Sequence, residues 1–341
     1  MFRRTFIPLF ALVSLTVAAL AREAPPPAPA KPPANWSQAI ERFATRVAAR
    51  HGWDARELKS LLKQARYQKS IIDAMNRPAE GMPWYRYHKI FLQPARIDAG
   101  VRFWREHRRL LEQAERKWGV PPHIVTAILG VETYYGRRAG GYRVIDALAT
   151  LAFAYPKRAA FFARELDEFL QLQHDEGLDP RATLGSYAGA MGMPQFIPSS
   201  YRAYAVDFDG DGRRDLLHSS ADVIGSVANY FARHGWRPGG PVALKLKPGQ
   251  VPAAASDELK PSIPLARFSA RGVGLPPGVG PRARGAVVAL EQPDGVEHWL
   301  GFDNFYVITR YNHSKLYAMA VHQLSERIRE RMHERQDTAS D

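Results

Sequence analysis

Gly130-Val131-Glu132-Thr133-Tyr134-Tyr135-Gly136 closes an apolar segment that begins near Ile124 and has the composition of a buried helix. Glu132 is the only acid between Val120 and Arg143. A carboxyl group held against apolar and aromatic neighbours resists ionisation. We therefore expect the pKa of Glu132 to be raised, so that it can donate a proton near neutral pH. The alternative is an ordinary solvated glutamate at the end of a helix.

The composition is that of a globular protein large enough for more than one domain. The chain has 341 residues, of which 45% are hydrophobic and 24% are charged. It contains no cysteine. This excludes disulfides, thiolate catalysis, cysteine-held zinc or iron–sulfur centres and a lipid-modified N-terminal cysteine.

The N-terminus has the features of a secretory signal. Arg3 and Arg4 precede an apolar run, Phe6 to Leu20, that is shorter than a typical membrane span. Ala19-Leu20-Ala21 has the small-x-small form of a cleavage site, so we expect a signal peptide over residues 1–21 and a soluble periplasmic protein. An uncleaved anchor is the alternative. No later segment is apolar for long enough to cross a bilayer, so we expect no stable membrane insertion.

The chain is strongly basic, with a formal net charge of +13. Such a charge attracts anionic polymers or surfaces at long range. Nucleic acid is not expected as a partner, because the Arg and Lys residues are dispersed and no nucleic-acid motif is present. A generally solvated basic surface is the alternative to a dedicated binding patch.

Helical spacing of apolar residues covers most of the chain and predicts a mainly α protein of the α+β class. We expect one long helix from Asp98 to about Gly119 and irregular structure over 76–93. Frequent Pro and Gly with short alternating apolar runs predict a small β-rich insertion after Pro238, with a hairpin turn at Pro293-Asp294-Gly295. The expected boundaries are a signal peptide 1–21, a Pro/Ala-rich linker 22–35, an N-terminal helical domain 36–118, a core 119–240, the β-rich insertion 241–300, a return to the core 301–333 and a flexible tail 334–341.

A second stretch of interest, Gly185 to Tyr201, is dense in small and aromatic residues. Its glycines let the backbone approach a ligand closely. Ser186 and Gln195 offer neutral hydrogen bonds, while Tyr187 and Phe196 offer flat apolar faces. This mixture suits a sugar, which is polar at its edges and apolar on its faces. A tight packing loop is the alternative.

A third stretch, Asp207-Phe208-Asp209-Gly210-Asp211-Gly212-Arg213-Arg214-Asp215, matches the front of an EF-hand calcium loop, with acids at positions one, three and five and glycine at six. The backbone carbonyl of Arg213 stands at position seven. His218 replaces the usual glutamate at position twelve, and Asp222 can take its place if the loop is longer. We expect a structural Ca²⁺; an acid-rich turn without metal is the alternative.

These motifs together resemble the lytic murein transglycosylase B family. The resemblance rests on Glu-Thr-Tyr-Tyr-Gly, Tyr-Ala-Gly-Ala-Met-Gly-x-x-Gln-Phe-x-Pro-Ser-Ser-Tyr, Asp-Phe-Asp-Gly-Asp-Gly, Gly-Ser-Val-Ala-Asn-Tyr-Phe and the late Thr309-Arg310-Tyr311-Asn312-His313-Ser314, in this order. It runs from about Trp36 to Arg331. It implies a lysozyme-like helical catalytic core with an additional helical domain and a small inserted β domain.

The resemblance also implies roles for single residues. Glu132 is then the catalytic acid and base, and Ser186 and Gln195 match positions near the reacting N-acetylmuramoyl unit. The aromatic cleft positions are matched by three tyrosines, with Asn312 beside them: Tyr230, Tyr311 and Tyr317. The calcium loop is matched by Asp207, Asp209, Asp211, the Arg213 carbonyl and Asp222.

The expected activity is that of a peptidoglycan lytic transglycosylase. It would cleave the MurNAc–GlcNAc β-1,4 bond and form a 1,6-anhydro-MurNAc end, without an organic cofactor. No second carboxylate follows Glu132 in the sequence until Asp146, which we expect to cap the next helix. A muramidase-type hydrolase of the same bond and a non-catalytic peptidoglycan-binding protein are the alternatives. The partner is the glycan strand of peptidoglycan, and a monomer is expected.

Overall fold

The structure is a computed structural model that describes residues 31–77, 82–253, 258–280 and 282–337. The predicted signal peptide, most of the predicted linker and the end of the predicted tail lie outside these residues. No helix among the described residues combines the length and the apolar character needed to cross a bilayer.

The chain forms two compact units, and each is described by itself. The first comprises residues 31–77 and 99–230 and is called the glutamate unit. The second comprises residues 82–98 and 231–337 and is called the sheet unit. The fold is mainly helical with small antiparallel sheets, as predicted. The domain boundaries expected from the sequence stay a prediction.

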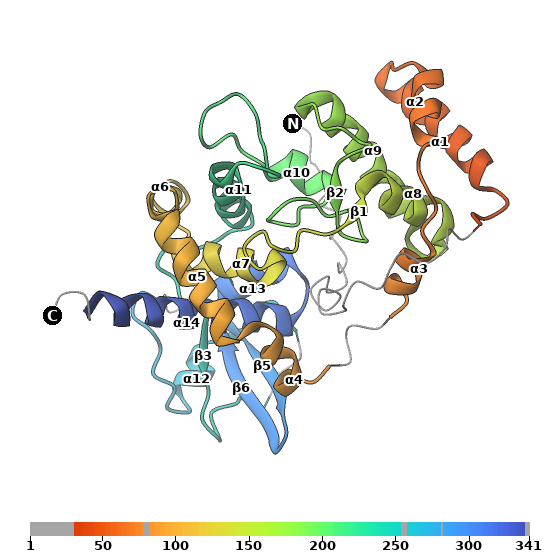
Figure 1. The fold of residues 1–341 in the computed structure, drawn as a ribbon. Coiled ribbons are helices and arrows are strands. Elements are labelled where there is room, and N and C mark those ends of the chain that lie inside the picture. The colour runs from red at the N-terminus through yellow and green to blue at the C-terminus, as the bar shows by residue number, and fades with distance from the viewer. Residues whose placement is uncertain (1–30, 78–81, 254–257, 281, 338–341) are drawn as a thin grey trace. The chain divides into compact units, whose positions relative to one another are not determined.

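Helices make up most of the glutamate unit (Figure 1). In chain order, with α5 and α11 crossing its boundaries, they are α1 (Trp36–His51), α2 (Ala55–Leu62), α3 (Lys69–Met75), α5 (Pro94–Glu106), α6 (Arg108–Trp118), α7 (Pro122–Thr133), α8 (Val144–Ala154), the 3-10 turn η2 (Pro156–Arg158), α9 (Ala159–Glu176), α10 (Pro198–Tyr204) and α11 (Ser220–Arg233). Two short strands, β1 (Tyr142–Arg143) and β2 (Leu184–Gly185), pair antiparallel.

Local sequence explains several of these helix ends. Asp54 precedes α2, and its carboxylate accepts hydrogen bonds from the backbone N–H groups of Arg56 and Glu57. The α1 helix ends where Gly52 takes a left-handed conformation. The long helix expected from Asp98 to Gly119 is instead two helices, because the α5 pattern stops at Glu106 and α6 begins after His107.

The sheet unit is built around a four-stranded antiparallel sheet of order β3-β6-β5-β4. Its strands are β3 (Ala243–Lys245), β4 (Ile263–Pro264), β5 (Arg284–Gln292) and β6 (Gly295–Gly301). The predicted turn joins β5 to β6, with Gln292 paired to Gly295, so the hairpin is confirmed. Phe268, Leu300 and Phe302 are buried in the apolar core beside this sheet.

The described residues of the sheet unit also form the helices α4 (Trp84–Phe91), α12 (Ala266–Ser269), α13 (Asp303–Tyr311) and α14 (Lys315–Asp337). The α4 helix packs on β5 and on α14 (Figure 1). The prediction of irregular structure over 76–93 was therefore wrong for this segment. Its buried residues Trp84, Tyr87 and Phe91 recur at helical spacing, so one helix face supplies the apolar surface.

Candidate active site

Helix α7 carries Glu132 near its C-terminal end. Pro122 stands in the first turn, where a missing N–H costs nothing, and almost every other side chain of the helix is buried. Glu132 itself is half-buried. The helix therefore holds one carboxylate at the edge of an apolar interior.

The turn that follows Glu132 has an unusual backbone. Tyr134 and Tyr135 both adopt left-handed conformations, with φ of 52° and 59°. The backbone N–H of Tyr135 donates to the Leu129 carbonyl at 3.0 Å, and the Tyr135 ring stacks on Phe103 with a centroid distance of 5.6 Å. Left-handed conformations are strained for residues other than glycine and persist where packing over-determines them, often at functional sites.

Thr133 ties this turn to a second segment, residues 185–196, which we call the glutamine loop. Its hydroxyl donates to the Met193 carbonyl at 2.9 Å and accepts from the Gly136 N–H at 3.0 Å. The residue next to Glu132 is thereby fixed to the glutamine loop. The two stretches singled out from the sequence lie side by side.

Gln195 sits at the end of the glutamine loop in a left-handed conformation with φ of 53°. Its side-chain amide donates to the carbonyls of Ala139 and Gly192, at 3.0 and 2.9 Å. Both amide protons are therefore engaged. Among the described residues none donates to its side-chain carbonyl oxygen, which is left as an acceptor for a ligand.

Ser186 and Tyr187 open the glutamine loop, and both are buried. The Ser186 hydroxyl oxygen accepts from the backbone N–H groups of Ala188 and Ala190, at 3.3 and 3.0 Å. Ser186 therefore shapes the loop, with its hydroxyl proton left for an acceptor. Burial raises the pKa of the Tyr187 phenol, so this side chain stays neutral and able to donate.

Tyr230 lies near the end of α11 in an aromatic cluster. Its ring is 5.6 Å from that of Phe196 and 4.8 Å from that of Tyr204, measured between centroids. Phe196 closes the glutamine loop through a β-bridge to Met191. This tyrosine predicted from the sequence thus packs directly against the loop.

The other predicted sugar-contacting residues, Tyr311, Asn312 and Tyr317, belong to the sheet unit and surround the junction of α13 and α14. Tyr317 and Asn312 are buried, and Tyr311 is half-buried with its ring 5.8 Å from that of Phe231. All three therefore lie in one short stretch of the sheet unit.

Residues 207–215, which we call the acid loop, bring three carboxylates together. Asp207, Asp209 and Asp211 each offer an oxygen within 4.8 Å of the others. Asp207 also accepts from the N–H groups of Gly210 and Gly212, at 2.7 and 2.9 Å, which curls the loop around its carboxylate. Clustered carboxylates repel one another, and hard oxygen ligands are the set that Ca²⁺ prefers. The residues present fit this ion.

Asp222 is fully buried at the start of α11 and joins the two ends of the acid loop. Its carboxylate accepts from the N–H groups of Phe208 and Asp215, both at 2.7 Å. Burial raises the pKa of Asp222, while these hydrogen bonds lower it. These contacts hold the two ends of the loop together, while the carboxylates that lie within 4.8 Å of one another are those of Asp207, Asp209 and Asp211.

Glu165 is a buried acid that sequence reasoning missed. Its carboxylate accepts from the Ser199 N–H at 3.0 Å, just beyond the glutamine loop, and burial raises its pKa to about 7. Its spacing to Phe162 and Phe169 places it on the buried stripe of α9, and this was the available signal. Asp146, expected as a helix cap, instead lies inside the first turn of α8 and pairs with Arg143 at 2.7 Å.

Residues 35–326 match the pattern of the transglycosylase SLT domain. The membrane-bound lytic murein transglycosylase B of Escherichia coli (strain K12) is 41% identical over 298 residues, covering 84% of this chain and 82% of that protein.

Solved structures give the same result. The Escherichia coli lytic transglycosylase Slt35 in complex with calcium is 40% identical, with a TM-score of 0.79 over 86% of this chain and 93% of that chain. SltB3 of Pseudomonas aeruginosa in complex with NAG-anhNAM-pentapeptide is 30% identical, with a TM-score of 0.75 over 86% of this chain and 79% of that chain. The chain therefore belongs to the family of peptidoglycan lytic transglycosylases that share the SLT domain.

Proposed function

We propose that the chain cleaves the MurNAc–GlcNAc β-1,4 bond with Glu132 as its single acid and base, and leaves a 1,6-anhydro-MurNAc end. The main support is the placement of Glu132, half-buried at the end of an apolar helix and tied to the glutamine loop through Thr133. The ligand of the Pseudomonas aeruginosa relative, NAG-anhNAM-pentapeptide, has the chemistry of such an end.

The proposed reaction uses one carboxyl group twice. Protonated Glu132 gives its proton to the glycosidic oxygen as the bond from that oxygen to muramoyl C1 breaks. The carbonyl of the 2-acetamido group stabilises the positive charge at C1. Ionised Glu132 then takes the proton of the C6 hydroxyl while the C6 oxygen bonds to C1. No water is consumed, and Glu132 ends protonated as it began.

The residues of the glutamine loop would orient the sugar. The free carbonyl oxygen of Gln195 accepts from a sugar hydroxyl or amide, and the hydroxyls of Ser186 and Tyr187 donate. Aromatic rings offer faces for sugar rings. We assign the remaining substrate contacts to four residues: Tyr230, Tyr311, Asn312 and Tyr317.

The acid loop would hold a structural Ca²⁺ through Asp207, Asp209, Asp211, the Arg213 carbonyl and Asp222. The supports are the close approach of three carboxylates and the calcium complex of the Escherichia coli relative. The ion would supply positive charge that relieves carboxylate repulsion. It has no part in the bond-breaking steps.

The setting that fits this chemistry is the periplasm, where a soluble monomer would act on peptidoglycan strands after removal of residues 1–21. The full chain has a net charge of +13, and removal of Arg3 and Arg4 with the signal would leave +11, which favours an acidic polymer as the substrate. Nucleic acid is not among the proposed partners.

Product analysis tests the proposal. Isolated sacculi are digested with wild type, Glu132→Gln and the control Glu41→Gln, which changes an exposed acid on α1. Mass spectrometry should find anhydro ends with wild type and the control and none with Glu132→Gln. Reducing ends, heavier by one water, would favour a muramidase. Unchanged products from Glu132→Gln would remove Glu132 from the reaction.

A further inference from the structure

A pocket of about 460 Å³ lies in the glutamate unit, apart from the residues assigned above to the sugar. Its walls are the C-terminal end of α9 with the segment up to β2, and the second half of the acid loop with the residues that follow it. The volume lies in the range of small-molecule sites, which begins at about 300 Å³.

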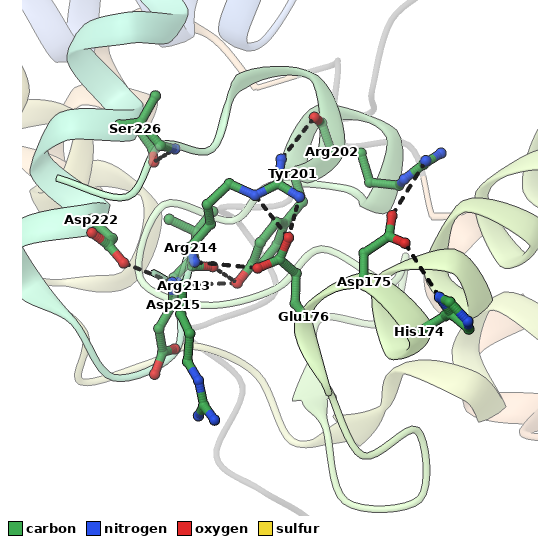
Figure 2. A network of polar contacts seen from close by, with 12 residues as sticks. His174, Asp175, Glu176, Tyr201, Arg202, Arg213, Arg214, Asp215, Asp222 and Ser226 are labelled. Carbon is green, nitrogen blue, oxygen red and sulfur yellow. Dashed lines mark hydrogen bonds and ion pairs between the residues drawn. The ribbon is translucent and has the colours of Figure 1, made fainter. Parts of the chain in front are cut away.

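The inner wall of this pocket is polar but internally satisfied. Arg214 donates to both carboxylate oxygens of Glu176, through its side chain at 2.7 Å and its backbone N–H at 3.2 Å (Figure 2). The Tyr201 hydroxyl donates to the Arg214 carbonyl and accepts from the Leu216 N–H. These groups fix the shape of the pocket and present no net charge to a ligand.

The Asp215 carboxylate, which also lines the pocket, contacts the His218 ring at 3.1 Å, and two further charged groups are left for a ligand. Arg213 is exposed, and among the described residues its guanidinium enters no ion pair; Figure 2 shows its side chain extending away from Glu176. The Asp179 carboxylate accepts a hydrogen bond from the backbone N–H of Arg181 at 2.8 Å, and it has no other partner in the part of the chain that the structure describes. Opposite charges in one pocket suit a ligand that carries both a carboxylate and an ammonium group.

The apolar part of the lining limits the ligand further. Leu178, Leu184 and Leu217 contribute aliphatic surface, and Leu184 is 49% exposed, which is unusual for a leucine in this chain. Exposed apolar surface in a pocket with a few polar groups is typical of a binding site. Leu184 is also two residues from Ser186, so the pocket and the glutamine loop share one stretch of chain.

We infer that this pocket binds the peptide stem of peptidoglycan, a short peptide with carboxylates, an amine and small aliphatic side chains. The inference rests on the proposed function, because that function makes a peptide-bearing glycan the substrate. Arg213 would pair with a stem carboxylate and Asp179 with a stem ammonium, while the leucines contact the aliphatic parts.

The acid loop links this pocket to calcium. Arg213 lies in the pocket wall, and its backbone N–H donates to Asp211 at 2.9 Å. Asp215 also lines the pocket and is bound through its N–H to Asp222. An ion that draws these carboxylates together fixes the same backbone that presents Arg213. Calcium and peptide should therefore raise each other's affinity, since coupling between two sites is reciprocal.

The test is calorimetric binding of the sugar-free tripeptide L-Ala-γ-D-Glu-meso-diaminopimelate to the full chain in 1 mM calcium. Arg213→Ala and Asp179→Ala should each weaken binding about tenfold, as should acetylation of the peptide amines. Arg271→Ala, which removes an exposed arginine from the sheet unit, should leave it unchanged. A chelator should weaken binding of the tripeptide to wild type several-fold.

Equal affinity in wild type and Arg213→Ala would overturn the inference. The inference would also be overturned if Gln195→Ala lost peptide binding while Arg213→Ala kept it. The peptide would then occupy the sugar site. Glu132→Gln should bind the tripeptide as wild type does. Since this measurement involves no turnover, failure of the pocket is distinguishable from failure of the proposed reaction, which is judged by product ends.

Discussion

Gly192 in the glutamine loop and Gly210 in the acid loop have similar backbone conformations, with φ of 69° and 80°, in very different surroundings. A Cβ on Gly192 would lie 2.2 Å from the backbone oxygen of Leu216. A Cβ on Gly210 would meet nothing within 4 Å. At these positions the glutamine loop is held by close packing in addition to its hydrogen bonds, whereas the acid loop is held by hydrogen bonds to its own carboxylates.

This difference has a functional meaning. A loop fixed by packing keeps its shape before substrate arrives, which is the preorganisation that catalysis needs. A loop whose three carboxylates face one another loses stability unless a cation joins them. A buried acid lies next to each loop. Glu165 accepts from the Ser199 N–H just beyond the glutamine loop, and Asp222 accepts from the Asp215 N–H at the end of the acid loop.

The largest effect is expected from Gly192→Ala. The left-handed backbone and the overlap with Leu216 should together cost about 4 kcal/mol of the free energy of unfolding. Gly210→Ala is the matched control. It should lower the free energy of unfolding by about 1 kcal/mol, because the left-handed backbone is unfavourable for alanine but the new Cβ meets no other atom. Urea unfolding in calcium measures both. Equal losses would show that packing does not distinguish the two loops.

Glu165→Gln should change the pH dependence of stability. The pKa of this acid is about 7 in the folded protein and 4.5 ordinarily. Below pH 4.5 the Glu165 carboxyl is protonated in both the folded and the unfolded protein, so it does not lower the free energy of unfolding. As the pH rises from 4.5 to 7, only the unfolded chain releases the proton, so stability falls by about 3 kcal/mol in total.

The measurement is urea unfolding of wild type and Glu165→Gln between pH 4.5 and 8.5, with the exposed Glu41→Gln as the control. The Gln variant should lose the decline that wild type shows toward pH 7. A decline of the same size in wild type and Glu165→Gln would mean that Glu165 is not the group responsible.

Local signals predicted much of this molecule. The β5–β6 hairpin followed from alternation around Pro293-Asp294-Gly295, and the close approach of Asp207, Asp209 and Asp211 followed from their spacing. Both features are specified by residues close in sequence. The cap of α2 is equally local, because the Asp54 carboxylate accepts from N–H groups two and three residues away.

Features that depend on distant contacts were missed. The break at His107 between α5 and α6 has no glycine or proline to mark it. The α4 helix was not predicted because Pro78, Gly81 and Pro83 favour irregular structure, although Trp84, Tyr87 and Phe91 recur at helical spacing. The role of Glu165 depends on Ser199, 34 residues away, so no local pattern could reveal its partner.

Removal of calcium should have the next largest effect. An ion bound only by the folded state stabilises by about 2 to 3 kcal/mol at a concentration 100 times its dissociation constant. A chelator should therefore lower the melting temperature of wild type, and added calcium should restore it. Asp209→Asn should blunt this response, while Gln195→Ala should keep it. If the chelator leaves the melting temperature of wild type unchanged, the acid loop holds no metal.

The smallest effect is expected where the acid loop is held by an aromatic contact. The Phe208 ring lies 5.2 Å from that of Trp118, and the Lys117 ammonium lies 4.6 Å and 5.5 Å from the Trp118 and Phe208 rings. Lys117 is exposed, so water weakens this attraction, and Lys117→Ala should cost only about 0.5 to 1 kcal/mol. Lys117→Arg keeps a cation over the rings and should restore most of the loss in urea unfolding. A loss as large as that caused by the chelator would mean that the acid loop, like the glutamine loop, depends mainly on packing.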